Sequence, residues 1–555
     1  MGVELYREII EPELWSEFGP HIQTYEAIMT NVFGDHAPSI PYRPIAELLA
    51  QYRDRNPAKA AIIDLESGST ITFGQLDRVT TEISLLLKAR GLAKGSRVLL
   101  LSDESLEKLL LWFGIWRLGA VVCPLNIQIQ PRVLADIVQI VKPMLILYHK
   151  DIDIDPLVGN CTAPRIRFGM WSTDRVVDQG DELFSELSKS RALTEPSERN
   201  APEDVASIYL TSGTTSRPKI VIYDHCAYWL NGLSALECLG LTEEDRTLEY
   251  RSFGWTSAQI LSLMPFLQKG LTLHIAKRFS HSRRFFEWIQ QYNITFAASV
   301  PTALNILLQK PLKYAAKDLT TLRLMSCSTA PLTAQQWLMF EEMYGVRLLQ
   351  LYGMSEAGWI CGNRTYKNRI GTVGMPALHQ EFAIVDSDGK LCPPDVEGEV
   401  TAGGPQTAVG YLMDDGTIAR IRPNRIKTGD LAIADSDGFI RVTGRIKDLI
   451  IRAGVNIAPL EIDEVLLMHA GILEAASVGV PDQIYGEEVV CYVVAKPDTT
   501  LTETSVRHHC EALLSPPKMP KQIFIVSELP KSDRGKVLRD RLREDWILRR
   551  QTSVF

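Results

Sequence analysis

The chain has 555 residues, of which 45% are hydrophobic and 23% charged, close to the averages of globular proteins. This composition excludes a disordered tail, a fibre and a small disulfide-rich scaffold, and the length predicts several structural units. With 59 Lys and Arg against 67 Asp and Glu, the net charge of −8 gives no broad positive field of the kind that nucleic-acid binding usually requires. We therefore expect no nucleic-acid partner.

Several sequence features predict where in the cell the protein resides and whether it binds zinc. Nine cysteines are scattered without a C-x-x-C pair, and no H-E-x-x-H motif occurs, so we expect reduced thiols and no zinc site. The first residues carry acids where a secretory signal needs a basic and then an apolar run. The strongest apolar run, 109–116, is far shorter than the roughly 20 residues of a membrane helix. These features predict a cytoplasmic protein without a membrane span.

In chain order, residues 1–40 predict an irregular leading segment, and regular patterns begin at residue 45. Short aliphatic runs at 97–101 and 144–148 are typical of strands buried on both faces, and a helical pattern over 104–118 lies between them. Such alternation predicts an α/β fold in which helices cover a mainly parallel sheet.

A second group of strands and helices covers about 200–375, with its clearest strands at 294–298 and 322–326. After about 376 the chain changes to short strands separated by Asp-Gly turns, a texture that predicts a small β-barrel or an antiparallel sheet. Residues 445–555 mix both textures and end in a charged helix around 538–549.

The most informative stretch is a Ser- and Thr-rich turn at 211–219, which follows a predicted strand at 206–210. Short hydroxyl side chains and backbone N–H groups can surround phosphate oxygens, and Lys219 adds a point charge for a terminal phosphate. The turn is not a Walker A loop, because Pro218 stands where that motif needs glycine. Taken alone, the same composition is also typical of a plain loop.

Further motifs follow this turn in a fixed order. They are Leu351-Tyr352-Gly353-Met354-Ser355-Glu356, Lys427-Thr428-Gly429-Asp430, Gly444-Arg445-Ile446-Lys447-Asp448 and Leu529-Pro530-Lys531-Ser532-Asp533-Arg534-Gly535-Lys536. Together they resemble the adenylate-forming superfamily, which comprises acyl-CoA synthetases, peptide-synthetase adenylation domains and beetle luciferases. The resemblance extends from about residue 45 to residue 536.

The resemblance implies a two-domain architecture. Residues 1–443 would form a large N-terminal adenylation domain, with two stacked α/β subdomains and a β-barrel that hold the ATP and acyl sites. Residues 444–555 would form a smaller, mobile α+β domain that carries the catalytic lysine. Lys447 lies where the family places the hinge between the two domains.

Family roles transfer to the matching residues as expectations. Lys536 would reach the α-phosphate and the substrate carboxylate, Ser355 would lie near the α-phosphate, and Glu356 would hold Mg²⁺; these are the expected catalytic residues. Tyr352 would stack on adenine and Asp430 would accept both ribose hydroxyls. The full set expected to bind the nucleotide is Thr211, Ser212, Gly213, Thr214, Thr215, Lys219, Thr329, Tyr352, Asp430 and Arg445.

The acyl pocket is expected at Phe253, Trp255, Val300, Ser328, Gly353 and Trp359. Gly254-Trp255 is similar to acetyl- and medium-chain acyl-CoA synthetases, and no acid stands nearby to pair with the amine of an amino acid. This favours a small or medium carboxylic acid, although tryptophans at such positions are equally typical of ordinary core.

Some residues depart from the family pattern. Ser216 and Ile220 stand where the family loop has glycine, and the segment 326–332 lacks the glycines that usually precede its Ala-Pro-Leu. A side chain at Ser216 or Ile220 would be strained if the backbone there needs a positive φ, and the side chains of the segment 326–332 would narrow the acyl pocket.

The implied function is ATP-dependent activation of a carboxylic acid to an acyl-adenylate, with release of pyrophosphate, followed by transfer to the thiol of CoA. The implied cofactors are ATP, Mg²⁺ and coenzyme A. One alternative is a stand-alone adenylation enzyme that loads the phosphopantetheine thiol of a separate carrier protein. Another is a non-catalytic nucleotide-binding pseudoenzyme, motivated by the lost glycines and opposed by intact Glu356, Asp430 and Lys536.

Overall fold

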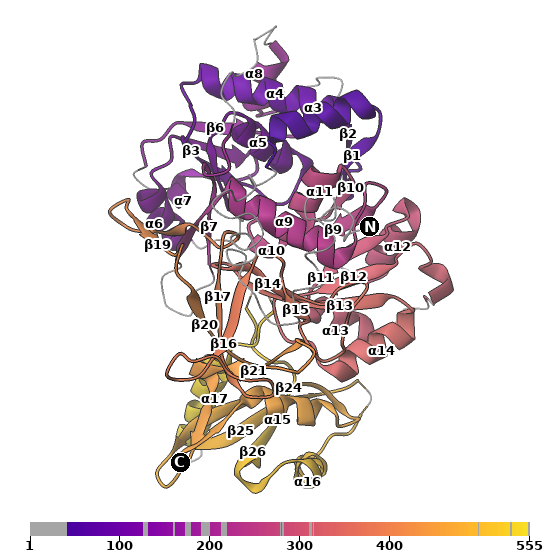
Figure 1. Ribbon diagram of the computed structural model, residues 1–555, viewed down its shortest axis with the longest axis vertical. Coiled ribbons are helices and arrows are strands. Elements are labelled where there is room, and N and C mark those ends of the chain that lie inside the picture. Colours follow the sequence, from indigo (N-terminus) through magenta and orange to yellow (C-terminus); the bar gives the residue numbers. More distant parts are fainter. Residues whose placement is uncertain are drawn as a thin grey trace, which may run out of the picture.

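The two large sheets lie side by side in the upper part of the molecule, and a smaller antiparallel sheet and then the C-terminal sheet follow along its long axis (Figure 1). The computed structural model describes residues 42–125, 131–158, 161–172, 179–189, 200–211, 219–277, 279, 282–309, 314, 316–497, 499–532 and 535–552. Within these residues no helix is both long enough and apolar enough to cross a membrane.

The first large sheet has eight strands in the order β19-β18-β8-β7-β4-β3-β5-β6, and its central strands are parallel. The strand predicted at 97–101 is confirmed as β3, and the one predicted at 144–148 appears one residue later as β5. The strands are β3 Arg97–Leu101, β4 Val121–Leu125, β5 Leu145–His149, β6 Arg165–Phe168, β7 Val205–Leu210, β8 Ile220–Asp224, β18 Gly410–Leu412 and β19 Ile418–Arg420.

The second large sheet has nine strands in the order β15-β14-β13-β12-β11-β9-β10-β1-β2, with parallel pairing from β1 through β13. The strands predicted at 294–298 and 322–326 lie one or two residues later, as β11 and β12. The strands are β1 Ala60–Asp64, β2 Thr70–Thr72, β9 Arg246–Glu249, β10 Thr272–Ile275, β11 Phe296–Ser299, β12 Leu324–Cys327, β13 Arg347–Met354, β14 Gly358–Gly362 and β15 Met375–Pro376.

Helices fill the space between and around these sheets, and some of them are buried along most of their length. Every residue of α5 (Leu106–Arg117) is buried, and its first turn is capped by Ser105, whose Oγ accepts a hydrogen bond from Lys108 N. Helix α9 (His225–Leu239) packs against β8 of one sheet and β14 of the other. The remaining helices of this part are α3 Ile45–Arg55, α4 Phe73–Ala89, α6 Pro131–Val141, α7 Asp155–Val158, α8 Leu183–Lys189, α10 Thr256–Ala258, α11 Met264–Lys269, α12 Ser282–Tyr292, α13 Pro301–Gln309 and α14 Ala334–Tyr344.

The β-rich texture after residue 376 forms an antiparallel sheet of four strands, β16 (Glu381–Val385), β17 (Gly398–Gly403), β20 (Ile426–Ala434) and β21 (Ile440–Arg445). A single 3₁₀ turn, η4 (Ile446–Asp448), connects it to the C-terminal sheet. That sheet and its helices comprise β22 Ile450–Arg452, β23 Val455–Ile457, α15 Pro459–Leu467, β24 Ile472–Asp482, β25 Gly486–Ala495, α16 Glu503–Leu513, β26 Gln522–Val526 and α17 Arg539–Thr552. The domain boundary at 443/444 stays a prediction.

The two large sheets meet at the carboxyl ends of β7 and β13. Tyr209, near the end of β7, donates a hydrogen bond from its hydroxyl to the carbonyl oxygen of Ser355, which follows β13, at 3.1 Å. Ligands of α/β proteins bind preferentially at such strand ends. The fold therefore brings the end of β7, where the Ser- and Thr-rich turn begins, to the motif at 351–356.

Candidate active site

Three residues expected to bind the nucleotide form one hydrogen-bonded cluster. Asp430 and Arg445 are cross-strand partners on β20 and β21, and Tyr352 reaches them from β13. The Tyr352 hydroxyl donates to one carboxylate oxygen of Asp430 at 2.6 Å, and Arg445 Nε donates to the other at 2.6 Å. The buried carboxylate is thus held in place by two donors, in a position where ribose hydroxyls could exchange with them.

Glu356 lies beside the base of the Ser- and Thr-rich turn. Its side chain is largely buried, and Oε1 accepts a hydrogen bond from the Tyr411 hydroxyl at 3.3 Å. The two ends of the turn are joined, because Thr211 N donates to the Lys219 carbonyl oxygen at 2.9 Å. The Lys219 ammonium lies 5.0 Å from the centroid of the Tyr411 ring. A carboxylate and an ammonium therefore flank the same aromatic ring.

The middle of the turn falls outside the described residues. This applies to Ser212, Gly213, Thr214 and Thr215, and also to Ser216. Ile220, by contrast, is the first residue of β8, pairs with Leu210, and is not among the residues of positive φ. The backbone at this position therefore needs no glycine.

Thr329 is a different case. It has a φ of 78°, a left-handed value that β-branched residues rarely adopt, and its buried Oγ1 has no hydrogen-bond partner within the described part of the chain. The sequence did not predict strain at this residue.

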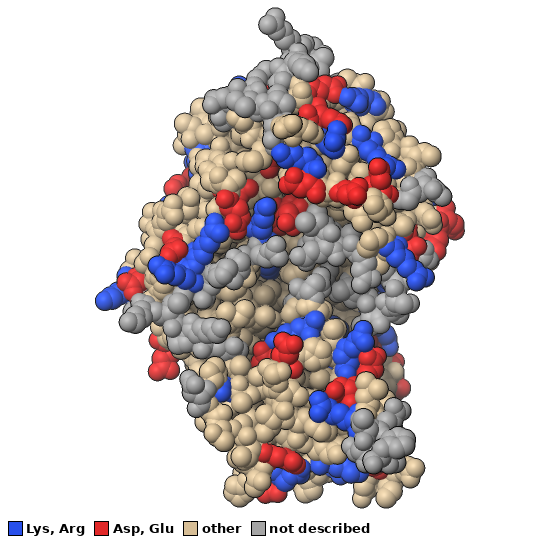
Figure 2. Space-filling view, turned by 180° about the vertical axis from the view of Figure 1, so that it is seen from behind, with Lys and Arg blue, Asp and Glu red and all other residues tan. Residues whose placement is uncertain are grey.

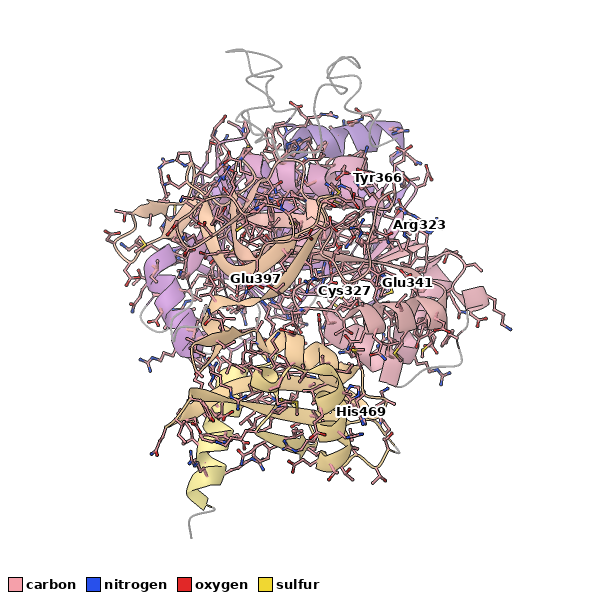
Figure 3. All side chains as sticks on the ribbon, turned by 60° about the horizontal axis from the view of Figure 1, so that its bottom comes forward. Arg323, Cys327, Glu341, Tyr366, Glu397 and His469 are labelled. Carbon is pink, nitrogen blue, oxygen red and sulfur yellow. The ribbon has the colours of Figure 1, made fainter. Side chains whose placement is uncertain are left out.

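Three of the residues expected to form the acyl pocket follow the carboxyl ends of neighbouring parallel strands. Trp255 follows β9, Val300 follows β11 and Ser328 follows β12. Figure 3 shows Cys327, the last residue of β12, near the middle of the molecule, with Glu341 farther out on α14 and His469 in the C-terminal domain. Trp255 remains partly exposed there.

Two other expected pocket residues are packed into the core. Phe253 and Trp359 are 1% and 3% exposed and belong to the main hydrophobic cluster. A Cβ on Gly362 would lie 2.8 Å from the Trp359 ring and 3.0 Å from Cys238 of α9, which places that ring against the helix. The structure therefore supports the interpretation that Trp359 is an ordinary residue of the hydrophobic core.

Gly353 has a steric reason to be glycine. A Cβ at this position would lie 2.4 Å from the carbonyl oxygen of Gly358 on the neighbouring strand β14. The close approach keeps the turn between β13 and β14 tight, and this turn carries Ser355 and Glu356.

Sequence reasoning missed a buried ion pair beside the expected pocket. Arg251 binds both carboxylate oxygens of Glu249, through Nε at 2.8 Å and Nη2 at 2.6 Å, and its Nη1 donates to Ser328 Oγ at 3.3 Å. The Glu-x-Arg spacing at the end of a strand could have signalled this pair, because residues i and i+2 face the same side.

Lys536 belongs to a short hairpin that contacts the N-terminal part of the chain. The hairpin is closed by a bridge between Lys531 and Val537 and by a hydrogen bond from Ser532 N to the Lys536 carbonyl oxygen at 2.8 Å. Thr302, in the first turn of α13, donates from Oγ1 to the Gly535 carbonyl oxygen at 3.4 Å. The hairpin of the C-terminal domain is therefore docked against α13 in this arrangement. Lys447 lies exposed in η4, and its role as hinge stays a prediction.

The residues present fit a magnesium-bound nucleoside triphosphate. No group of three or more His, Cys, Asp or Glu that could hold a metal occurs among the residues described. A single carboxylate near the Ser- and Thr-rich turn would match the usual Mg²⁺ arrangement, in which phosphate oxygens and water supply the other ligands. Over the face seen in Figure 2, acidic and basic side chains are interspersed, without one large area of either sign.

Comparisons with known proteins identify the family of the chain. Residues 49–412 match the family described as AMP-binding enzyme, and residues 461–536 match the AMP-binding enzyme C-terminal domain. The chain is 30% identical to an oxalate–CoA ligase of Arabidopsis thaliana over 89% of this chain and 97% of that protein. It is 31% identical to a fatty acid–[acyl-carrier-protein] ligase of Streptomyces coeruleorubidus, over 89% and 94%. Among solved structures, ATP-bound MatB from Rhodopseudomonas palustris has a TM-score of 0.79 at 26% identity, covering 90% of this chain and 99% of that one.

Proposed function

Because the chain belongs to the AMP-binding enzymes of the adenylate-forming superfamily, we propose that it activates a small or medium carboxylic acid and transfers the acyl group to CoA. It is an AMP-forming ligase, and its first product is an acyl-adenylate. The observation that carries the proposal is the hydrogen-bonded cluster of Tyr352, Asp430 and Arg445, in which Tyr352 lies on the strand that leads to Glu356. The contact of the Lys536 hairpin with Thr302, just after β11 of the same sheet, supports it.

In the first half-reaction, the substrate carboxylate attacks the α-phosphorus of ATP, and pyrophosphate leaves. A carboxylic acid with a pKa of about 4 is already ionised at pH 7, so no general base is needed. The barrier is electrostatic, because an anion approaches a polyanion and negative charge builds up in the transition state. Lys219 would hold the departing phosphates, and Lys536 would neutralise charge at the α-phosphate and the attacking carboxylate.

Glu356 would hold Mg²⁺, which supplies positive charge against the phosphate oxygens when it is bound. Asp430 would accept the ribose hydroxyls, with Arg445 beside it, and Tyr352 would lie along the adenine. Thr211, Ser212, Gly213, Thr214 and Thr215 would line the phosphates from the turn.

In the second half-reaction, a thiol attacks the acyl-adenylate, and AMP leaves. Lys536 must then withdraw from the path of the thiol, which calls for rotation of the C-terminal domain about Lys447. The exposed position of Lys447 in a single 3₁₀ turn between two sheets supports this role.

CoA is the proposed acceptor, since relatives with this family's domains include an oxalate–CoA ligase. The similarity to a fatty acid–[acyl-carrier-protein] ligase keeps a carrier-protein phosphopantetheine thiol as the second candidate. The partly exposed Trp255 at the end of β9 supports a small or medium acid. The free cysteines, all nine of which carry no disulfide, support a cytoplasmic location.

The test is carboxylate-dependent ATP–pyrophosphate exchange over a panel of carboxylic acids, followed by thioester formation with free CoA. We expect exchange with at least one small or medium acid, and Lys536→Ala should slow it by at least about a hundredfold, since it removes the charge at the reacting centre. The same variant should convert a supplied acyl-adenylate and CoA to thioester at nearly the original rate.

The outcomes of these assays distinguish the proposed CoA ligase from the two alternative functions. Exchange without a CoA thioester, but with acylation of a carrier protein, would favour the carrier-loading enzyme. No exchange with any acid would favour the nucleotide-binding pseudoenzyme. Equal loss of both half-reactions in Lys536→Ala would contradict the role given to the lysine.

A further inference from the structure

Tyr411 lies at the junction of two motifs that are far apart in the chain. It is the middle residue of β18, which pairs with β8 so that Tyr411 lies opposite Val221. Strand β8 begins directly after Lys219, so this register places the Tyr411 ring beside the exit of the Ser- and Thr-rich turn. No sequence motif identified above includes this tyrosine.

The ring and the hydroxyl of Tyr411 contact groups of opposite charge. The Lys219 ammonium lies 5.0 Å from the ring centroid, within the distance of a cation–π interaction. The hydroxyl donates to Glu356 Oε1 at 3.3 Å. The side chain is half-buried, and its ring packs against the main core.

We propose that Tyr411 is a positioning residue that holds Glu356 and Lys219 in the orientations needed for a magnesium-bound triphosphate. The inference rests on the proposed function for the roles of these two residues. The hydroxyl fixes one carboxylate oxygen and leaves the other to face a cation. The ring supports the ammonium without neutralising it, whereas a direct ion pair between Lys219 and Glu356 would withdraw both charges from the ligand.

The two contacts can be removed separately. Tyr411→Phe keeps the ring beside Lys219 and removes only the hydroxyl, so it should weaken the response to Mg²⁺. Tyr411→Leu removes both contacts. ATP binding is measured by calorimetry without the acid substrate, once with excess Mg²⁺ and once with EDTA, which provides a readout that does not depend on turnover.

We expect Tyr411→Phe to weaken ATP binding about tenfold in Mg²⁺ and by less than about twofold in EDTA, because the lost hydrogen bond goes to the metal-binding carboxylate. Tyr411→Leu should weaken binding several-fold in EDTA as well, since the support of Lys219 is lost too. The Mg²⁺ concentration for half-maximal pyrophosphate exchange should rise in Tyr411→Phe.

Tyr366 offers a matched control, because its hydroxyl also donates to a glutamate, Glu237, outside the site. Tyr366→Phe should leave ATP binding and the Mg²⁺ requirement unchanged. Equal ATP affinity of Tyr411→Phe and the unaltered protein in Mg²⁺ would overturn the inference, as would equal losses in Mg²⁺ and EDTA. Failure of the proposed function gives a different result, namely no carboxylate-dependent exchange in the unaltered protein.

Discussion

Thr329, one of the residues expected to bind the nucleotide and the neighbour of Ser328 in the expected acyl pocket, has a strained backbone. Its φ of 78° brings Cβ close to the following carbonyl group, which costs roughly 1–2 kcal/mol for an L-residue. Its buried Oγ1 has no hydrogen-bond partner among the described residues, which adds a desolvation cost. Strain of this kind persists only where the surrounding structure holds it, and it concentrates at functional sites.

Thr329→Gly should therefore stabilise the protein. Relief of the strained backbone exceeds the additional entropy of glycine in the unfolded chain, so we expect the free energy of unfolding to rise by about 1 kcal/mol. Thermal unfolding measures the change, and the acid panel tests whether larger acids are then accepted. Asn293→Gly is the control, because Asn293 has a φ of 50° and asparagine tolerates this region. A lower midpoint for Thr329→Gly than for the unaltered protein would show that Thr329 is not strained.

Individual site residues differ in how far the sequence predicts them. Tyr352, Asp430 and Arg445 could be predicted as one cluster, because each lies in a motif and the order of motifs is specific. Tyr411 could not, since its contacts depend on the register of β18 against β8, whose residues are remote in the chain. The possible strain at Ile220 likewise depended on a backbone angle, which only the strand pairing reveals.

Among the elements, long buried strands and helices were easier to predict than their exact ends. The run 97–101 matches β3, and the helical pattern over 104–118 corresponds to α5, trimmed by its Ser105 cap. Strands β11 and β12 begin later than predicted, because Ile294 and Leu322 are buried by tertiary packing outside the ladder. A pattern of apolar residues predicts which residues are buried, whereas the ends of a strand depend on hydrogen bonds to neighbouring strands.

The lysine hairpin provides an element-scale prediction. Gly535 has a φ of 75°, and a Cβ there would lie 2.2 Å from Thr302 Oγ1. In Gly535→Ala either the Thr302 side chain or the hairpin must move, so the contact that holds the hairpin beside α13 is lost and we expect Lys536 to shift. We expect adenylation to slow by about a hundredfold, the effect of a displacement of about 1 Å, while thioester formation from a supplied acyl-adenylate changes little. Stopped-flow or quench measurements of each half-reaction would separate the two steps.

Gly389 supplies a matched control for the backbone effect. It has a φ of 80°, and no other atom lies within 4 Å of the position that a Cβ would occupy, so Gly389→Ala introduces similar strain without a clash. This variant should lose some stability and keep both half-reactions. If Gly535→Ala adenylated as fast as Gly389→Ala, the docking of the hairpin on α13 would be irrelevant to the first step.

At the scale of the whole molecule, three buried histidines connect stability to pH. His225 lies on α9, His274 on β10 and His379 between β15 and β16, and burial lowers the pKa of each to about 4. An unfolded chain, in which histidine has a pKa of about 6.5, binds protons that the folded chain does not. The stability that depends on these neutral rings is present above about pH 6.5 and is lost as the pH falls toward 4.

At pH 5.5 the three histidines together should cost about 4 kcal/mol of unfolding free energy relative to pH 7.5, since each is about one pH unit below its unfolded pKa. Thermal unfolding at the two pH values measures the loss, and exchange activity should disappear with it because all three lie in the N-terminal part of the chain.

His274→Gln removes one titrating ring, and its midpoint should fall by about a third less between the two pH values, whatever its absolute stability. His508, whose side chain is 89% exposed, is the control, and His508→Gln should keep the full decrease. Identical decreases in the two variants would mean that His274 is protonated in the folded protein, or that another group governs acid unfolding.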